Sequence, residues 1–176
     1  MAATAFTSCT WWIKFEKFGA LLPEAWYYER TALGLSELVQ AFNQSFSYTL
    51  DGNDIDTERQ QHFANLIDQV QEVEAVAAIA RANYGKVPMA VASNGQRTVV
   101  EPTIKTIGLH SLFHTIVTLD DVEVGKPAPD LFLLAAERMG VAPDECIVYE
   151  DSDAGLLAAC RARMRSIDVR ILGRGA

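Results

Sequence analysis

The sequence has little positive charge, few cysteines and no long apolar run, and each shortage narrows what the protein can do. Its 15 lysines and arginines stand against 23 aspartates and glutamates, which gives a net charge of -8. Proteins that bind nucleic acids need a basic face against the phosphate backbone, so we expect no nucleic-acid partner. A local basic pocket for a small phosphorylated metabolite is still compatible with this charge.

The small number of cysteines and the lack of long apolar runs also indicate where in the cell the protein is expected. The three cysteines are odd in number, and their spacing is not typical of metal ligands. No segment approaches the ~18 consecutive apolar residues that a membrane helix needs. The first ten residues lack the basic start and apolar stretch of a secretory signal. We therefore expect a cytoplasmic protein without a membrane partner.

The sequence does contain enough apolar material for a packed core, since 49% of its 176 residues are hydrophobic. Short, continuously apolar runs alternate with helical patterns in the second half. The runs lie at 88–92, 115–119, 146–149 and 166–169. The helical patterns lie between the turn at 93–95 and Ile107, at 130–139 and at 154–163. This alternation is typical of a parallel sheet with flanking helices. We predict an open α/β fold, whose ligands bind at the carboxyl ends of the strands.

The first half has the apolar period of helices instead. The periodicity predicts helices over 31–44 and 56–84, with a polar loop over 45–53 between them. The apolar positions of the second helix, which include Phe63, Leu66 and Val70, form one stripe. This half is therefore predicted to be a helical unit attached to the sheet.

Polar residues follow the predicted strands at three places. Ser93 follows the first strand and offers a hydroxyl near a helix N-terminus, where a phosphate is favoured. Lys126 offers a positive charge against phosphoryl oxygens. Glu150 and Asp151 are adjacent carboxylates at a strand end, which suits Mg²⁺ with its waters. Taken singly, each also has a structural interpretation: a helix N-cap for Ser93, a surface lysine, and an acidic helix start.

Together these residues resemble the motifs of the haloacid dehalogenase (HAD) superfamily. The matching segments are Val-Ala-Ser-Asn at 91–94, Gly-Lys-Pro-Ala-Pro-Asp at 125–130 and Tyr-Glu-Asp-Ser-Asp-Ala-Gly at 149–155. They are most similar to the phosphosugar phosphatase and β-phosphoglucomutase branch, including its fructose-1-phosphate phosphatase-like members. The resemblance implies a Rossmann-type core at 1–22 and 85–176 and a helical cap, shortened here, at 23–84.

The resemblance also implies roles for individual residues. Ser93, Asn94 and Lys126 would bind the phosphate of the substrate, and Lys126 would also serve in catalysis. Asp151, Glu150 and Glu16 would hold Mg²⁺. Two departures from the family pattern accompany them: Pro102 should kink the helix after Ser93 or delay its start, and Arg163 stands where the family usually has a glycine.

The first motif of the family, Asp-x-Asp-Gly-Thr after a strand, has no intact counterpart. The best match is Trp-Ile-Lys-Phe-Glu-Lys-Phe-Gly-Ala-Leu-Leu at 12–22, read as an apolar strand followed by the motif. This alignment puts Glu16 at the nucleophile position and Phe18 at the acid/base position. Glu16 moves the attacking oxygen by roughly 1 Å, which can cost about 10²-fold. Phe18 cannot transfer a proton, a contribution of typically 10²–10⁴-fold.

These observations favour a HAD-like protein with a phosphate and Mg²⁺ pocket and weak or absent hydrolysis. One alternative is an active, Mg²⁺-dependent phosphosugar phosphatase that uses Glu16 as its nucleophile. Another is a non-catalytic interaction protein, in particular a homodimer built through the shortened cap and the aromatic residues near the N-terminus.

Overall fold

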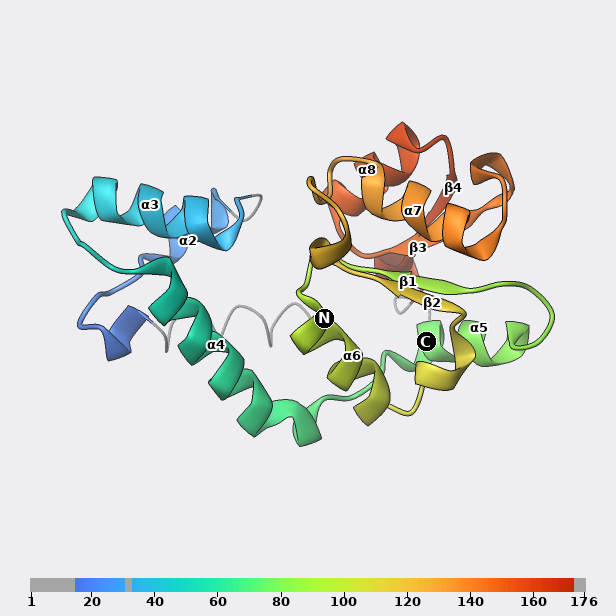
Figure 1. The fold of residues 1–176 in the computed structure, drawn as a ribbon, viewed down its shortest axis with the longest axis horizontal. Coiled ribbons are helices and arrows are strands. Elements are labelled where there is room, and N and C mark those ends of the chain that lie inside the picture. The colour runs from blue at the N-terminus through green and yellow to red at the C-terminus, as the bar shows by residue number, and fades with distance from the viewer. Residues whose placement is uncertain (1–14, 31–32, 173–176) are drawn as a thin grey trace. The chain divides into compact units, whose positions relative to one another are not determined.

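The structure is a computed structural model that describes residues 15–30 and 33–172. The chain divides into two compact units, Met1–Asp68 and Gln69–Ala176, which Figure 1 draws from blue to green and from green to red. The expected division into an α/β core at 1–22 and 85–176 and a helical cap at 23–84 stays a prediction.

The first unit is helical in its described part. Its helices are α2 (Glu24–Tyr28), α3 (Leu35–Phe46) and α4 (Gly52–Leu66), and a short 3-10 helix, η1 (Ile67–Gln69), follows. Its core is largely aromatic and aliphatic, made of Phe15, Ala20, Leu22, Val39, Phe42 and Ile55. This unit therefore has a hydrophobic core of its own.

The structure corrects the strand expected over 12–15. Residues 12–14 lie outside the described residues, but residues 15–17 are helical. Phe15 is fully buried, and its ring packs edge-on against that of Phe42 with the centroids 4.7 Å apart. The strand prediction is wrong for Phe15, because an apolar run cannot by itself distinguish a buried strand from a buried helix segment.

The second unit contains four strands and the helices between them. Its helices and strands are α5 (Glu74–Asn83), β1 (Ala90–Ala92), α6 (Arg97–Thr106), β2 (Thr115–Val117), α7 (Asp130–Met139), β3 (Ile147–Glu150), α8 (Asp153–Arg161) and β4 (Arg165–Asp168). Short 3-10 helices lie at η2 (His110–Leu112), η3 (Leu119–Asp121), η4 (Pro143–Glu145) and η5 (Val169–Ile171). Strands and helices alternate as the sequence predicts.

All the strand pairs of the described residues are parallel, as expected. β1 pairs with β2, and Ala90 is opposite Thr115. β3 pairs with β4, and Ile147 is opposite Arg165. Within residues 15–30 and 33–172 the strands thus form two parallel pairs, β1–β2 and β3–β4.

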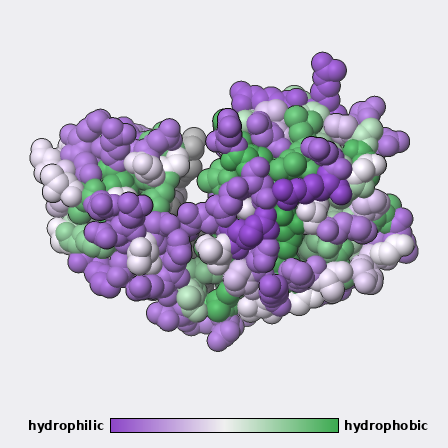
Figure 2. Space-filling model, in the orientation of Figure 1, coloured by the Kyte–Doolittle hydropathy of each residue, from purple (hydrophilic) through white to green (hydrophobic). Residues whose placement is uncertain are grey.

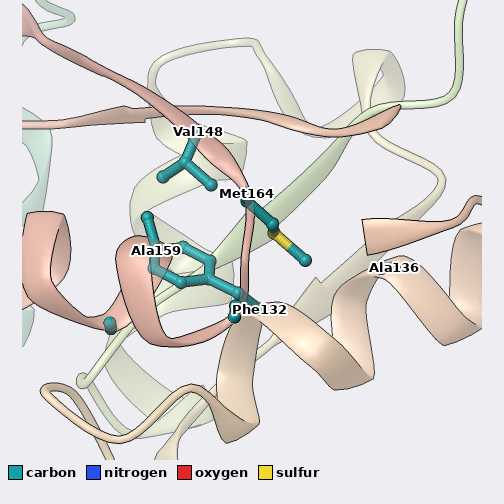
Figure 3. Packing of buried hydrophobic residues seen from close by; sticks show 7 residues of the cluster. Phe132, Ala136, Val148, Ala159 and Met164 are labelled. Carbon is teal, nitrogen blue, oxygen red and sulfur yellow. The ribbon is translucent and has the colours of Figure 1, made fainter. Parts of the chain in front are cut away.

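Helix α7 packs against both strand pairs. Leu131 and Ala135 pack with Val117 of β2. The neighbouring positions Phe132 and Ala136 pack with Val148 of β3, in a cluster that also contains Ala158, Ala159, Ala162 and Met164 (Figure 3). Two neighbouring faces of α7 therefore pack on the β1–β2 pair and on the β3–β4 pair. This packing holds the carboxyl ends of both strand pairs in one region of the unit.

Local signals set several element ends. Helix α7 has the predicted bounds, and Gly140 ends it with φ 67°. Such a left-handed φ is costly for residues with a side chain. Arg163, in the place of the family's glycine, adopts φ 59°. Helix α6 begins at Arg97 and still contains Pro102 in its interior, so its start is not late enough to place the proline in the first turn.

The long helix predicted over 56–84 is wrong. The structure has α4 to Leu66, the 3-10 turn η1, and α5 only from Glu74. Helix α4 also begins earlier, because Asp51 accepts a hydrogen bond from the backbone N–H of Asn53 at 2.7 Å and caps it.

One face of the surface is largely polar. On the face shown in Figure 2, hydrophilic residues cover most of both units, and hydrophobic residues appear in smaller groups among them. Across the residues that the structure describes, none of the helices combines the length and the apolar character needed to cross a membrane.

Candidate functional site

The candidate site is built around an ion pair at the end of β3. Lys126 donates to Glu150, with 2.6 Å between Nζ and Oε2, and the two side chains are only 10% and 7% exposed. The ammonium of Lys126 also lies 4.7 Å from the ring centroid of Phe132. A lysine expected from the sequence to face a ligand is thus held by a buried carboxylate and an aromatic ring.

Both carboxylate oxygens of Glu150 accept hydrogen bonds from the protein. Oε2 accepts a hydrogen bond from the ammonium of Lys126. Oε1 accepts hydrogen bonds from the backbone N–H of Asp151 at 3.1 Å and from the hydroxyl of Ser152 at 2.8 Å. Burial alone would raise the pKa of Glu150, but the charge and hydrogen bond of Lys126 hold it below its usual value. Glu150 is therefore an ionised, internally satisfied partner of Lys126.

Asp151 has the opposite environment, although it is adjacent in sequence. The residue is exposed, while partial desolvation of its carboxyl, together with the hydrogen bond and the charge of Glu150, raises its pKa. Of the two adjacent carboxylates predicted to bind Mg²⁺, Asp151 is the one that can reach a ligand from solvent.

Asn94 ties the loop after β1 to the loop that carries Lys126. Its side-chain N–H donates to the carbonyl of Lys126 at 3.0 Å, and its Oδ1 accepts the backbone N–H of Lys126 at 2.7 Å. A Cβ at Gly125 would lie 2.6 Å from that same Oδ1, so the close approach requires glycine there. The amide of Asn94, predicted to bind substrate, is used here to position Lys126.

Ser93 lies beside Asn94 at the end of β1. Its Oγ accepts the backbone N–H of Gly95 at 3.0 Å, and its own backbone N–H donates to Val117 of β2. The hydroxyl proton can still be donated to a ligand oxygen. The structure thus connects Asn94, Lys126, Glu150 and Asp151 through direct hydrogen bonds, with Ser93 next to them in the chain.

Glu16 and Phe18 belong to the first unit. Glu16 is exposed in the helical segment, and Phe18 packs against the aromatic core of that unit. Their predicted positions as nucleophile and acid/base stay predictions.

The sequence analysis missed a second carboxylate centre, at Asp121. Its Oδ2 accepts the backbone N–H of Thr118 at 2.8 Å and a guanidinium N–H of Arg97 at 2.5 Å, and its Oδ1 accepts Arg138 at 2.9 Å. Burial opposes the charge, but hydrogen bonds from Thr118 and Arg138 lower the pKa of Asp121 to about 2. The spacing Thr-x-x-Asp at 118–121, typical of a capping box, was the available signal.

Replacing Asp121 by asparagine should destabilise the protein by about 2 kcal/mol at pH 7, since hydrogen bonds to a charged group are lost. A lowered carboxyl pKa stabilises the fold above the unfolded pKa of ~3.9, and this contribution fades as the pH falls toward about 2. Urea unfolding of the native chain and of Asp121→Asn should therefore differ at pH 7 and converge only as the pH falls toward about 2.

Glu123→Gln is the matched control for this experiment, because Glu123 is an exposed carboxylate of the same loop. It should change the free energy of unfolding by less than ~0.5 kcal/mol. Equal effects of the two substitutions would contradict the role assigned to Asp121.

Fold and site together define a Rossmann-type α/β protein with polar groups at the carboxyl ends of parallel strands. A family model described as haloacid dehalogenase-like hydrolase matches residues 3–163. The chain therefore belongs to the haloacid dehalogenase-like hydrolases, as its motifs suggested.

Two curated relatives indicate the branch. Over 107 residues, 61% of this chain and 56% of the relative, the chain is 41% identical to the fructose-1-phosphate phosphatase YqaB of Escherichia coli (strain K12). Over 159 residues, 88% of this chain and 71% of the relative, it is 33% identical to YhcW of Bacillus subtilis (strain 168). The matched part thus spans about half the length of YqaB.

The fold itself is shared with β-phosphoglucomutase from Clostridium difficile. That structure aligns with a TM-score of 0.73 and 20% identity, over 92% of this chain and 75% of the other. At this identity the likeness concerns the fold. The phosphosugar branch is indicated by the curated relatives.

Proposed function

We propose that this chain binds the phosphate group of a small phosphorylated metabolite, together with Mg²⁺, and hydrolyses it weakly or not at all. The observation that supports this most is the Lys126–Glu150 pair beside the exposed carboxylate of Asp151. The buried pair keeps a positive charge in place, and Asp151 supplies a ligand for a cation.

Of the carboxylates expected to bind Mg²⁺ in the second unit, only Asp151 is available to a metal ion. Mg²⁺ keeps most of its waters and is commonly held by one or two carboxylates and the phosphate of the substrate. Asp151 fits that role, whereas the carboxylate of Glu150 is occupied by Lys126 and Ser152. Among the described residues no three histidine, cysteine or acidic side chains are grouped as a ready metal site. Bound Mg²⁺ would neutralise part of the phosphate charge.

The residues of the chain would then divide the work. Lys126 offsets the negative charge of the phosphate, and Ser93 donates its hydroxyl proton to a phosphate oxygen. Asn94 fixes the backbone of Lys126. A sugar phosphate is the proposed substrate class, because the relative YqaB is a fructose-1-phosphate phosphatase.

Weak turnover follows from the two positions aligned with the family's catalytic aspartates. Glu16 is exposed on a helical segment, and Phe18 contributes to an apolar core. An apolar packing role is consistent with Phe18 and incompatible with proton transfer. The native chain is then expected to bind phosphate without efficient hydrolysis.

A phosphatase assay tests this proposal. With fructose 1-phosphate and other sugar phosphates, in saturating Mg²⁺, the native chain should release phosphate at or near the background rate. Inorganic phosphate should nevertheless bind, as followed by calorimetry, and Ser93→Ala should weaken binding about tenfold through the loss of one hydrogen bond to a charged ligand.

The variants Phe18→Asp and Glu16→Asp/Phe18→Asp test whether activity is missing because the two aspartates of the family's first motif are absent. A gain of activity in the double variant would support a disabled phosphatase. Substantial Mg²⁺-dependent turnover by the native chain, lost in Asp151→Ala, would overturn the proposal in favour of an active enzyme that uses Glu16.

A homodimer remains our proposal for the assembly, and light scattering would test it.

A further inference from the structure

A cavity of about 240 Å³ lies at the edge of β2, in the second unit. It is lined mainly by Arg97, Glu101, His110, Phe113, His114 and Arg138. These residues come from α6, η2, the segment before β2 and the end of α7 (Figure 1). None of its lining residues belongs to the candidate phosphate site of Ser93, Lys126 and Glu150, so the cavity is separate from that site.

Two arginines, Arg97 and Arg138, line this cavity, although the chain carries a net charge of -8. Glu101, its one carboxylate lining residue, is neutralised from both sides. Its Oε1 lies 2.7 Å from the guanidinium of Arg97, and its Oε2 lies 3.7 Å from Nζ of Lys105. These contacts lower the pKa of Glu101 and raise that of Arg97.

Arg138 completes the wall of the cavity. One of its nitrogens contacts Asp121 at 2.9 Å, and Asp121 is also bound by Arg97. Three cations, Arg97, Lys105 and Arg138, thus share two carboxylates, Glu101 and Asp121. Asp120 also accepts the backbone N–H of Arg97 at 2.7 Å, so these positive and negative charges balance, and the preference for an anion rests on the hydrogen-bond donors of the cavity.

The hydrogen-bond donors of the cavity suit an anion. Nδ1 of His114 accepts the backbone N–H of Met89 at 3.2 Å. In the neutral imidazole the proton must then be on Nε2, which makes His114 a donor. The guanidinium of Arg138 contacts Asp121 through Nη2 in the described part of the chain, so its other N–H groups can be donated. His110 adds a second imidazole at the wall.

We infer that this cavity is a second anion site, which binds a small oxoanion such as inorganic phosphate or the phosphate group of a small metabolite. Arg138 and Nε2 of His114 are its principal donors, and Arg97 and His110 complete its wall. The cavity has roughly the volume of eight water molecules, which accommodates a tetrahedral oxoanion and some of its waters. The inference does not depend on the function proposed above for the site of Ser93, Lys126 and Asp151.

The imidazole signals of His110 and His114 provide a local readout. At a fixed pH of about 7.5, inorganic phosphate is titrated into the full chain against chloride at equal ionic strength. We expect a saturable shift of the His114 signal with phosphate. Arg138→Gln should weaken the apparent affinity by about tenfold, the effect of losing one charge-assisted donor.

Two further variants keep the test decisive. Arg165→Gln removes an exposed arginine from β4 and should leave the titration unchanged. His114→Gln should weaken the phosphate-dependent shift of His110, which reports the same cavity even if Arg138→Gln folds poorly. Shifts that fail to saturate, that equal those with chloride, or that persist unchanged in Arg138→Gln and His114→Gln would overturn the inference. Because the readout is local to these histidines, it is separate from binding at Ser93 and Lys126.

Repeating the titration with fructose 1-phosphate identifies the source of the anion. A saturable shift with the sugar phosphate supports a metabolite phosphate, and a shift with inorganic phosphate alone supports the free ion. Either result is consistent with the site, whereas the absence of both contradicts it.

Discussion

Lys126→Met is expected to lower the free energy of unfolding by about 3 kcal/mol at pH 7. The substitution keeps an unbranched side chain of similar length against Phe132 but removes the charge. It leaves Glu150, which is 7% exposed, without its counter-ion. Removing one partner of a buried ion pair typically costs 3–5 kcal/mol, because the remaining charge stays desolvated.

The pH dependence of this effect has a definite sign. The lowered pKa of Glu150 means that its contribution to stability is present above the unfolded value of ~4.3 and is lost as the pH falls through the lower folded value. Urea unfolding of the native chain and Lys126→Met should therefore differ most near pH 7 and converge below about pH 4.

Two companion variants separate the charge from the packing. Lys126→Arg retains the charge and should recover part of the stability. In the double variant Lys126→Met/Glu150→Gln the buried charge is gone, so the loss should be smaller than the sum of the two single losses. Equal stability of the native chain and Lys126→Met at pH 7 would contradict the importance assigned to the pair.

Gly155→Ala is expected to destabilise the protein by about 1–3 kcal/mol and to displace the carboxylate of Glu150 from Lys126. Gly155 is buried in the first turn of α8, and a Cβ there would overlap the carboxyl carbon of Glu150. Overpacking of this kind costs typically 1–3 kcal/mol. The cost must exceed the gain of up to ~1 kcal/mol that alanine brings over glycine within a helix.

Gly52→Ala is the matched control, because Gly52 also lies in the first turn of a helix, α4, and a Cβ there has nothing within 4 Å. This variant should be neutral or slightly stabilising. Unfolding by urea should thus give opposite signs for the two substitutions, and calorimetry should show weaker phosphate binding for Gly155→Ala alone. If Gly155→Ala stabilised the chain as Gly52→Ala does, the tight packing under Glu150 would be disproved.

The expected arrangement of the second unit was largely readable from the sequence. The bounds of α7 agree because Asp130 begins a helical period and Gly140 ends it with a left-handed φ. Strand β3 was expected at 146–149 and lies at Ile147–Glu150. These elements have local signals, namely turn residues and continuous apolar runs, that do not depend on distant contacts.

The errors lie where such signals were absent or misleading. Nothing between Leu66 and Glu74 is a glycine or proline, and the apolar period continues through Ile67 and Val70, so the break between α4 and α5 could not be read. Phe15 was placed on a strand, although its ring is packed in a helical unit. For Phe15, packing against side chains distant in sequence, such as Phe42, overrides the local pattern.

By itself, the sequence determined the family, the alternation of parallel strands and helices, and the order of Ser93, Lys126 and Glu150–Asp151 along the chain. Only the tertiary structure decided how these residues divide their tasks. In β3, Val148 and Glu150 are buried while Ile147 and Tyr149 are exposed, an alternation that an apolar run does not reveal. Glu150 therefore lies inside and binds Lys126, and Asp151, one residue beyond the strand, faces solvent because successive side chains of an extended chain point to opposite sides.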